Sequence, residues 1–386
     1  MKPVTCQGFF LIFVAISKKY ENVLCSSTKL VTLPILLLIH KRLCAIMERE
    51  TGGIKNGEKK CNLCRYCSIY RFSKTTISRY FNNPDSITVE NQEKIANALE
   101  VLDYKENKLA RVMANGKTEM VGVIIPNLYM HYYSDMLDHI ISTYEEYGYK
   151  FIVFAGNEDA DVERRYIQEL LAYKTEGLII LSHTLSSKEL AEYHVPIVTI
   201  EREDEYVCSV NTDNYMGGVQ AATVLAKSGC DILVHANAGL PSTIPAYGRI
   251  QGFQNFCETN GLEHRIMIRD FGASFEENNA EIAKLLQEIE ESYPDKKVGI
   301  FMPSDTHANI LLNLIIRKYG TLPERYKIVG FDNSPVSREA VFPITTVGQQ
   351  MDKIAQEAVE LLSLQISERK KRRPKPLAAP IHKVLT

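Results

Sequence analysis

Residues 73–82 combine a helix-capping residue, an apolar face and a face of hydrogen-bonding and positively charged side chains. Ser73 is a good N-cap, and Ile77, Tyr80 and Phe81 then fall on one side of the predicted helix. The other side carries Lys74, Thr75, Ser78, Arg79 and Asn82. Such side chains reach phosphates and base edges, and an arginine binds a guanine edge with two hydrogen bonds. The pattern predicts a recognition helix for the major groove of DNA.

A second group of polar residues follows predicted buried strands or, for Arg249, begins a predicted helix. It consists of Asn127, Tyr132, Tyr133, Asp213, Arg249, Asp305, Asp332 and Asn333. Ligands bind outside the carboxyl ends of the strands in open α/β sheets. Carboxylates and an arginine beside tyrosines hydrogen-bond several hydroxyl groups while an aromatic ring covers the C–H side of a sugar. A helix N-cap is the alternative role for each aspartate, and surface packing is the alternative for Tyr132.

The sequence offers little support for an enzyme or a metal protein. It contains no phosphate-binding glycine loop and no GxSxG element, and its histidines are scattered, with His131, His183 and His307 predicted in loops. Cys61, Cys64 and Cys67 have the spacing of thiolate ligands, but no fourth cysteine or histidine follows within short reach. We expect no catalytic residue, no metal and no cofactor.

Two further helical segments flank the predicted recognition helix, which ends at Asn82-Asn83-Pro84. One follows Ser86 or Thr88 as its cap, and its expected apolar stripe is Val89, Ile95, Leu99 and Leu102. The other, residues 107–114, is closed by Asn115-Gly116. A helix of about two turns is marginal alone, so we expect it to form only against DNA or a partner chain.

From Val121 onward, short runs rich in valine and isoleucine alternate with amphipathic helices. The strand-like runs are VGVIIP, YKFIVFAG, EGLIILS, PIVTIE, DILVHAN, RIMIRD, KKVGIFMPSD and YKIVGFD. Alternation of this kind gives parallel sheets with helices on both faces, and this many strands predicts two such sheets with a ligand cleft between them. The expected helices include residues 134–148 and 162–174.

The first 70 residues differ in character from the rest. They hold most of the nine cysteines and two apolar runs, GFFLIFVAI and LVTLPILLLI, each shorter than the roughly twenty residues of a membrane-spanning helix. Polar residues after the first run, from Lys18 to Asn22, argue against a signal peptide. We interpret this anomalous segment as the product of a wrong reading frame or a misplaced start, and we expect no membrane association.

From about residue 70 the sequence resembles the LacI/GalR (lactose-repressor) family of bacterial transcription regulators. The resemblance rests on SKTTISRYFNN, SITVENQEKIANALEVLDY, NKLARVMANGKT and the VGVIIPN that follows. It implies a helix-turn-helix DNA-binding domain over residues 71–106, a hinge helix over residues 107–117, and an effector-binding and dimerisation domain over residues 118–386. The last is a two-lobed, periplasmic-binding-protein-like α/β domain. The segment CRYCSIYR departs from the family pattern where the first helix should lie.

The resemblance also assigns roles to residues. It implies base contacts for Lys74, Thr75 and Arg79, backbone contacts for Ser73, Thr76, Ser78 and Asn82, and minor-groove contacts for Met113 and Ala114. For the effector it implies Tyr132, Tyr133, Asp213, Arg249, Asp305 and Asp332, although Asp305 has a structural role as its alternative.

The C-terminal residues resemble the last crossover of the family, a strand followed by a helix that returns to the first lobe. The basic run from Glu368 to Lys375 is interpreted as a solvated loop before a final strand, IHKVL. No leucine-heptad tail follows in this sequence, so we expect a homodimer.

The resulting hypothesis is a cytoplasmic repressor whose affinity for operator DNA is controlled by a small carbohydrate bound between two lobes. A net charge of −2 requires that DNA binding come from a local surface. The alternatives are a periplasmic sugar-binding protein, which would lack the segment 72–116, and an enzyme of a related α/β fold, which would turn over its ligand.

Overall fold

The computed structural model of the protein describes residues 72–101, 117–202, 206–242, 244–272, 274–370 and 380–385. The chain divides into a smaller unit, residues 1–107, and a larger unit, residues 108–386. The predictions for residues 1–70, for the hinge helix, and for Met113 and Ala114 fall on residues outside those described. The same holds for the side chains of Lys74 and Asn82.

The described part of the smaller unit is a pair of helices joined by a 3-10 turn: α4 (Lys74–Asn82), η1 (Pro84–Ser86) and α5 (Val89–Val101). The predicted cap is confirmed, because Ser73 Oγ accepts the Thr76 N–H at 3.0 Å. Ile77, Ile95 and Ala98 are buried together. The prediction for Val89 is wrong, since its side chain is 69% exposed. Val89 lies nine residues before Ala98, half a helical turn away from the packed face.

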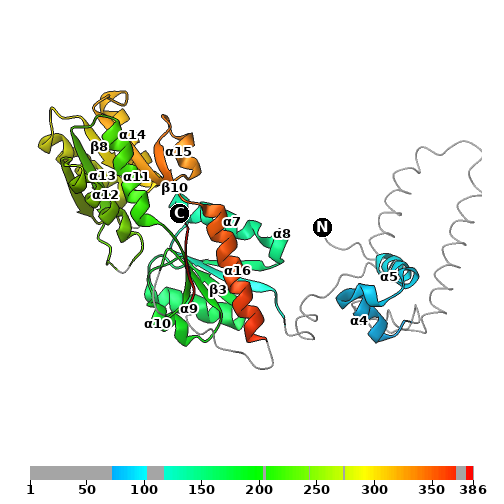
Figure 1. Cartoon of the computed structure of the whole chain (residues 1–386). Coiled ribbons are helices and arrows are strands. Elements are labelled where there is room, and N and C mark those ends of the chain that lie inside the picture. The colour runs from blue at the N-terminus through cyan, green and yellow to red at the C-terminus, as the bar shows by residue number, and fades with distance from the viewer. Residues whose placement is uncertain are drawn as a thin grey trace, which may run out of the picture. The chain divides into compact units, whose positions relative to one another are not determined.

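The larger unit contains two parallel sheets, each the centre of one lobe (Figure 1). The sheet of lobe A has the order β11-β5-β4-β3-β1-β2. Its strands are β1 (Met120–Ile125), β2 (Lys150–Ala155), β3 (Gly177–Ile180), β4 (Ile197–Ile200), β5 (Cys208–Thr212) and β11 (His382–Leu385). The sheet of lobe B has the order β10-β9-β8-β6-β7. Its strands are β6 (Ile232–Ala238), β7 (His264–Arg269), β8 (Val298–Phe301), β9 (Tyr326–Asp332) and β10 (Thr345–Gly348). The predicted strands are confirmed.

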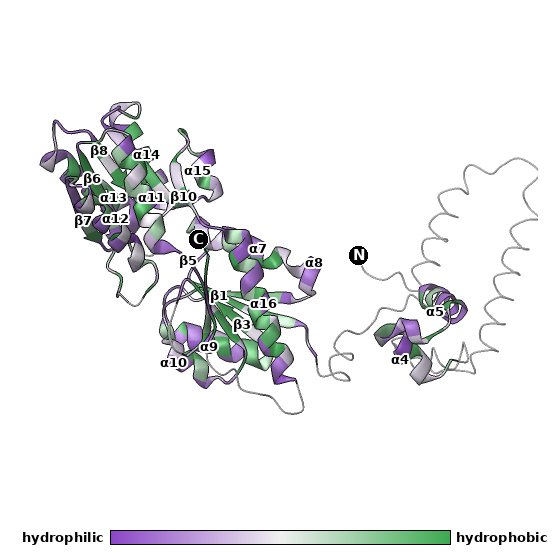
Figure 2. Cartoon of the chain, in the orientation of Figure 1, coloured by the Kyte–Doolittle hydropathy of each residue, from purple (hydrophilic) through white to green (hydrophobic). Residues whose placement is uncertain are grey.

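Helices cover both faces of each sheet, and successive side chains of β1 therefore pack in different cores. Val121, Val123 and Ile125 pack in one core with α7 (His131–Ser142) and α16 (Met351–Arg369), whereas Ile124 packs in another with α9 (Ala160–Ala172) and α10 (Ser187–Glu192). In lobe B the two cores involve α13 (Phe275–Ser292) and α14 (Asp305–Tyr319) on one face, and α11 (Asn214–Lys227) and α12 (Tyr247–Thr259) on the other. Figure 2 shows these strands as hydrophobic and the outer helix faces as hydrophilic.

Helix α7 begins earlier than the sequence predicts. The helix starts at His131 rather than at Ser134, and the N–H of its N-cap residue, Met130, donates to Asn127 Oδ1. It ends at Thr143, and α8 (Tyr144–Tyr147) follows. The loop predictions for His131 and His307 are wrong, because both residues lie in the first turn of a helix, α7 and α14.

The chain crosses between lobes between β5 and α11 and again between β10 and α16. The second crossing confirms the predicted return to the first lobe, and the predicted final strand pairs with β5. The basic run begins inside α16 rather than in a loop, because Glu368 and Arg369 are helical, and residues 371–379 lie outside those described. Across the described residues, no helix combines the length and hydropathy that a bilayer crossing needs.

Helices α11 and α12 approach so closely that only glycine fits at two positions. A Cβ on Gly218 would lie 2.2 Å from Arg249 O, and one on Gly252 would lie 1.9 Å from Tyr215 O. These backbone contacts fix the position of α12, whose first turn carries the buried Arg249.

Candidate functional site

A cavity of about 520 Å³ lies between the two lobes. Its walls come from segments that follow β1, β2 and β3 in lobe A and β6, β7 and β8 in lobe B. The lining residues from lobe A are Pro126, Asn127, Tyr129, Met130, Tyr133, Glu158, His183 and Thr184. Those from lobe B are Ala238, Leu240, Ile244, Asp270, Phe271, Gly272, Asn278, Pro303 and His307. The cavity thus occupies the carboxyl ends of the strands, where ligands bind in such folds.

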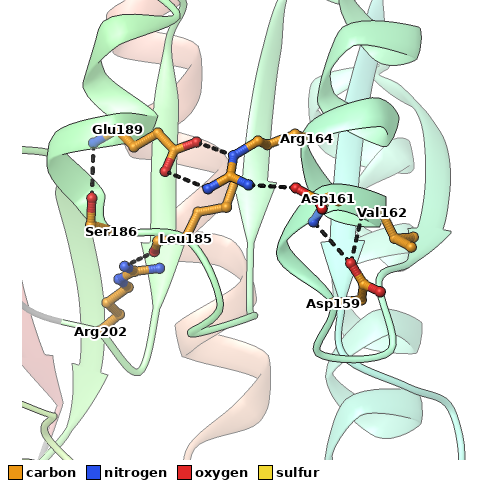
Figure 3. Close-up of polar contacts among 8 residues, drawn as sticks. All are labelled: Asp159, Asp161, Val162, Arg164, Leu185, Ser186, Glu189 and Arg202. Carbon is orange, nitrogen blue, oxygen red and sulfur yellow. Dashed lines mark hydrogen bonds and ion pairs between the residues drawn. The ribbon is translucent and has the colours of Figure 1, made fainter.

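The wall segment 182–185 in lobe A is held from behind by a buried acid and an arginine. Glu163 of α9 is fully buried, and its Oε1 accepts the Ser182 hydroxyl at 2.6 Å. Burial raises the pKa of the Glu163 carboxyl, while Ser182 and Thr184 act in the opposite direction. Arg202 donates to the carbonyls of Ser182 and Leu185, and Figure 3 shows its guanidinium against Leu185. These bonds fix the backbone that carries His183 and Thr184.

The same region is braced by ion pairs on the outside of lobe A (Figure 3). Arg164 of α9 bridges Asp161 in its own helix and Glu189 of α10, at 2.8 and 2.6 Å. Asp159 caps α9 and Ser186 caps α10 through their side-chain oxygens. The two helices are therefore joined behind the wall segment.

In lobe B, the buried His307 forms part of the wall. Its Nδ1 is 2.7 Å from Ser304 Oγ, and its ring lies 4.6 Å from that of Phe271. Burial lowers the pKa of His307 to about 4, so its ring is neutral at physiological pH. The lobes also touch beside the cavity. The His131 N–H donates to Thr306 Oγ1 at 3.2 Å, and the rings of Tyr129 and Phe275 form a T-shaped, edge-to-face contact.

A buried polar cluster lies where the chain crosses between the lobes, and we call it the hinge cluster: Glu201, Thr212, Asn214, Arg249, Asp332 and Gln349. Glu201 accepts from Asn214 Nδ2 at 2.7 Å, and Asn214 Oδ1 accepts from Arg249 Nε at 2.7 Å. Thr212 donates to Gln349, which in turn donates to Asp332 at 2.7 Å. The cluster joins lobe A to lobe B through side chains at both crossings.

Arg249 and Asp332 are both buried within the hinge cluster. The Arg249 guanidinium donates to the Pro303 carbonyl at 2.8 Å and lies 3.6 Å from the centre of the Phe331 ring. Burial raises the pKa of Asp332 well above its usual range, and the nearby Arg249 opposes this shift. Asp332 has a φ of 108°, a conformation that costs about 1–3 kcal/mol and must be imposed by its surroundings. Neither residue lines the cavity.

Tyr133 lies at the cavity, and its neighbour Tyr132 lies near the charged residues of the hinge cluster. Tyr133 lines the cavity, whereas the Tyr132 hydroxyl is buried without a hydrogen-bond partner among the described residues. Burial, and then the charges of Glu201 and Asp332, raise the pKa of Tyr132 well above its usual range. The two rings form a T-shaped, edge-to-face contact with their centres 5.2 Å apart, so Tyr132 lies between the cavity wall and the charged residues of the hinge cluster.

Asp213 and Asp305 have partners within the protein. Asp213 caps α11 by accepting the Met216 N–H at 3.0 Å. Asp305 is fully buried and does not cap α14, which Ser304 does. Its carboxylate accepts from the Ser334 N–H and hydroxyl and from Thr346, which ties α14 to the segment after β9 and to β10.

Asp305 should make the stability of lobe B depend on pH. Burial raises the pKa of its carboxyl to about 6, above the value of about 4 in the unfolded chain. Between these values the folded state binds more protons than the unfolded state, so this contribution to stability falls as pH rises. From pH 5 to pH 7 the loss is about 1 kcal/mol. Chemical denaturation at both pH values should show that Asp305→Asn removes this difference, and an equal difference in both proteins would contradict it.

Most of the residues that line the cavity were not predicted from the sequence. The aromatic and polar residues Tyr129, Glu158, Thr184, Asp270, Phe271 and Asn278 line it, and the two histidines set aside as loop residues, His183 and His307, line it too. Most of these follow strands directly, which was an available signal. The burial of Glu163 could also have been predicted, because it lies four residues before Ile167 and therefore on the same, buried face of α9.

A second concavity, of about 530 Å³, lies in lobe B and is lined by residues such as Asp231, Lys297 and Arg325. It is at the amino-terminal ends of β6, β8 and β9, away from the strand ends that bind ligands. Within the described ranges, no group of three or more metal-ligating side chains comes together.

The side chains of Thr75, Ser78 and Arg79 in α4 and of its N-cap residue, Ser73, are exposed. Thr76 is partly buried, and its hydroxyl lies 2.7 Å from Ser73 Oγ. The described helices thus present one apolar face to each other and one polar face outward.

The larger unit has the two-lobed α/β fold of periplasmic-binding-protein-like proteins. Comparison with known proteins gives the same fold. The periplasmic binding protein-like domain family matches residues 223–384. The sucrose operon repressor of Pediococcus pentosaceus is 27% identical, covering 77% of this chain and 89% of its own length. The ribose operon repressor of Halalkalibacterium halodurans is 26% identical, covering 78% and 88%. The lac repressor dimer bound to operator has the same fold, with a TM-score of 0.69 and 20% identity over 85% of this chain and 96% of its own.

The two operon repressors are each covered over nearly nine tenths of their own length. The chain is thus similar in sequence to repressors of sucrose and ribose operons, and in fold to the lac repressor.

Proposed function

We propose that the protein is a repressor whose affinity for operator DNA is set by a sugar bound in the cavity between lobes A and B. The observation that carries this proposal is a cavity whose walls come from both lobes and which adjoins the hinge cluster. A ligand that contacts both walls favours one angle between the lobes. Such a ligand must change operator affinity if that angle differs between the free and DNA-bound states.

The proposed DNA contacts come from α4, with Arg79 as the principal base-reading residue and Thr75 beside it. Ser73, Ser78 and the partly buried Thr76 would contact the DNA backbone. We further propose that the repressor acts as a cytoplasmic homodimer, because paired recognition helices read a two-fold symmetric operator. The relatives named above, repressors of sucrose and ribose operons, support a carbohydrate effector.

Arg79→Ala tests the role of α4. We expect it to weaken binding to a duplex enriched by the protein from a random-sequence library by about 10- to 100-fold, because one base-reading contact is lost. Binding to a scrambled duplex should weaken only slightly. Fluorescence anisotropy at one fixed salt concentration measures both affinities.

The matched control is Lys94→Ala, which also removes one cation from the helix pair but from α5, where Lys94 pairs with the exposed Glu90. It should leave the preference for the enriched duplex intact. Equal losses on both duplexes for Arg79→Ala would remove this residue from base recognition.

A further inference from the structure

The cavity is lined by acids and neutral groups. Two of its lining residues carry carboxylates, Glu158 and Asp270, and none of the lining residues given above is a lysine or arginine. The buried His307 is neutral at physiological pH, because burial lowers its pKa to about 4.

Two arginines, Arg249 and Arg202, lie behind the cavity walls, and both donate hydrogen bonds within the protein. Arg249 is buried and donates to Asn214 and to the Pro303 carbonyl. Arg202 donates to two backbone carbonyls of the wall segment, and Figure 3 shows one of these bonds. Rotating either guanidinium into the cavity would leave buried carbonyl or amide oxygens without partners, which costs about 1–3 kcal/mol for each group.

Helix N-termini, the other common anion-binding elements, are also occupied. Ser304 Oγ accepts the His307 N–H at the start of α14, and Asp159 caps α9. At α7, Asn127 accepts the Met130 N–H, and Thr306 of the opposite lobe accepts that of His131. At α13, Ser274 and Glu277 form a reciprocal capping box.

What remains is a wall suited to an uncharged polyol. Glu158, Asp270, Thr184 and Asn278 can accept hydrogen bonds from hydroxyl groups, and the neutral His307 adds a ring nitrogen. Tyr129 and Phe271, with the apolar Met130, Leu240 and Ile244, supply surfaces for C–H groups. We infer that the effector is a neutral sugar, and that the cavity selects against sugars bearing a phosphate or carboxylate group. This inference rests on the proposed function.

A panel of neutral sugars, each paired with its phosphate ester, tests the inference on the full chain by isothermal calorimetry. The panel contains sucrose with sucrose 6-phosphate, ribose with ribose 5-phosphate, and further mono- and disaccharides treated likewise. We expect any sugar that binds to bind at least about tenfold more tightly than its ester, because the ester places negative charge beside two carboxylates. An ester that binds as tightly as its parent would overturn the inference and leave the proposed function standing. Binding by no member of either set would overturn both.

A double variant and a control variant test whether Glu158 and Asp270 cause the preference for the neutral sugar over its phosphate ester. Replacing both acids (Glu158→Gln with Asp270→Asn) should narrow the preference for the neutral sugar severalfold, because the repulsion of the ester is removed. Glu192→Gln, on the exposed end of α10 and outside the cavity lining, makes the same kind of charge change and should leave the preference as it is. An unchanged preference in the double variant would show that the two carboxylates do not cause it.

Discussion

Arg249→Ala should abolish the response of the protein to its sugar and lower the free energy of unfolding of the larger unit by about 3 kcal/mol. The substitution leaves Asn214 Oδ1 and the Pro303 carbonyl, both buried, without their donor. It also removes a charge that lowers the pKa of Asp332 through space, so this carboxyl becomes harder to ionise. Because the hinge cluster spans both crossings, its disruption should uncouple the lobes. Urea denaturation measures the stability, and anisotropy with and without sugar measures the response.

Two controls separate loss of the hinge cluster from loss of a positive charge. Arg249→Lys keeps the charge but cannot form the same two bonds and lie flat on Phe331, so an intermediate effect is expected. Arg265→Ala removes an arginine that pairs with the carboxylate of Glu288 on the exposed surface of lobe B, away from the cavity lining, and should change little. Full sugar response in Arg249→Ala would show that the hinge cluster does not couple the lobes.

Gly252→Ala should lower the melting temperature by about 5–10 °C, corresponding to about 2–3 kcal/mol. Its Cβ would lie 1.9 Å from Tyr215 O, a backbone atom that moves only if α11 moves. The better helix propensity of alanine offsets at most about 1 kcal/mol of this loss. Since α12 carries Arg249, the shift should also weaken sugar binding. Differential scanning calorimetry and sugar titration measure the two effects.

Gly239→Ala is the matched control for this substitution. Its Cβ would meet Ile268 Cγ2 at 3.4 Å, an ordinary contact, and no other atom within 4 Å. The free energy of unfolding should change by less than about 0.5 kcal/mol. A Gly252→Ala protein as stable as this control would mean that α11 and α12 are not packed as described.

The sequence predicts the central strands well because they are buried on both faces and read as continuous apolar runs, as in Val121 to Ile125. Helix starts are predicted less well. Capping side chains such as Ser304 help to determine where a helix begins, and they look like ordinary loop residues in the sequence. His131 and His307 were therefore predicted to be loop residues, although both lie in the first turn of a helix.

The candidate site was predicted only in part, because local patterns do not contain strand order. Every strand end looks equivalent in sequence, yet the cavity lies over the half of each sheet formed by β3-β1-β2 and β8-β6-β7. The ends of β5 and β9, with Thr212 and Asp332, lie in the other halves, beside the crossings, and hold the hinge cluster. Of the predicted effector-binding residues, Tyr133 lines the cavity, whereas Arg249 and Asp332 lie in the hinge cluster. Direct effector contact by these two residues stays a prediction.

The most direct test of the proposed function is the effect of sugar on operator affinity. Two forms are titrated against the enriched duplex, the full chain and one in which residues 1–71 are replaced by a first helix of family-consensus sequence. Each titration is run with and without the sugar that binds best in calorimetry. We predict salt-sensitive binding by at least one form and a change of about fivefold or more on adding sugar. Operator affinity that is the same in saturating sugar, or binding by neither form, would contradict a sugar-controlled repressor.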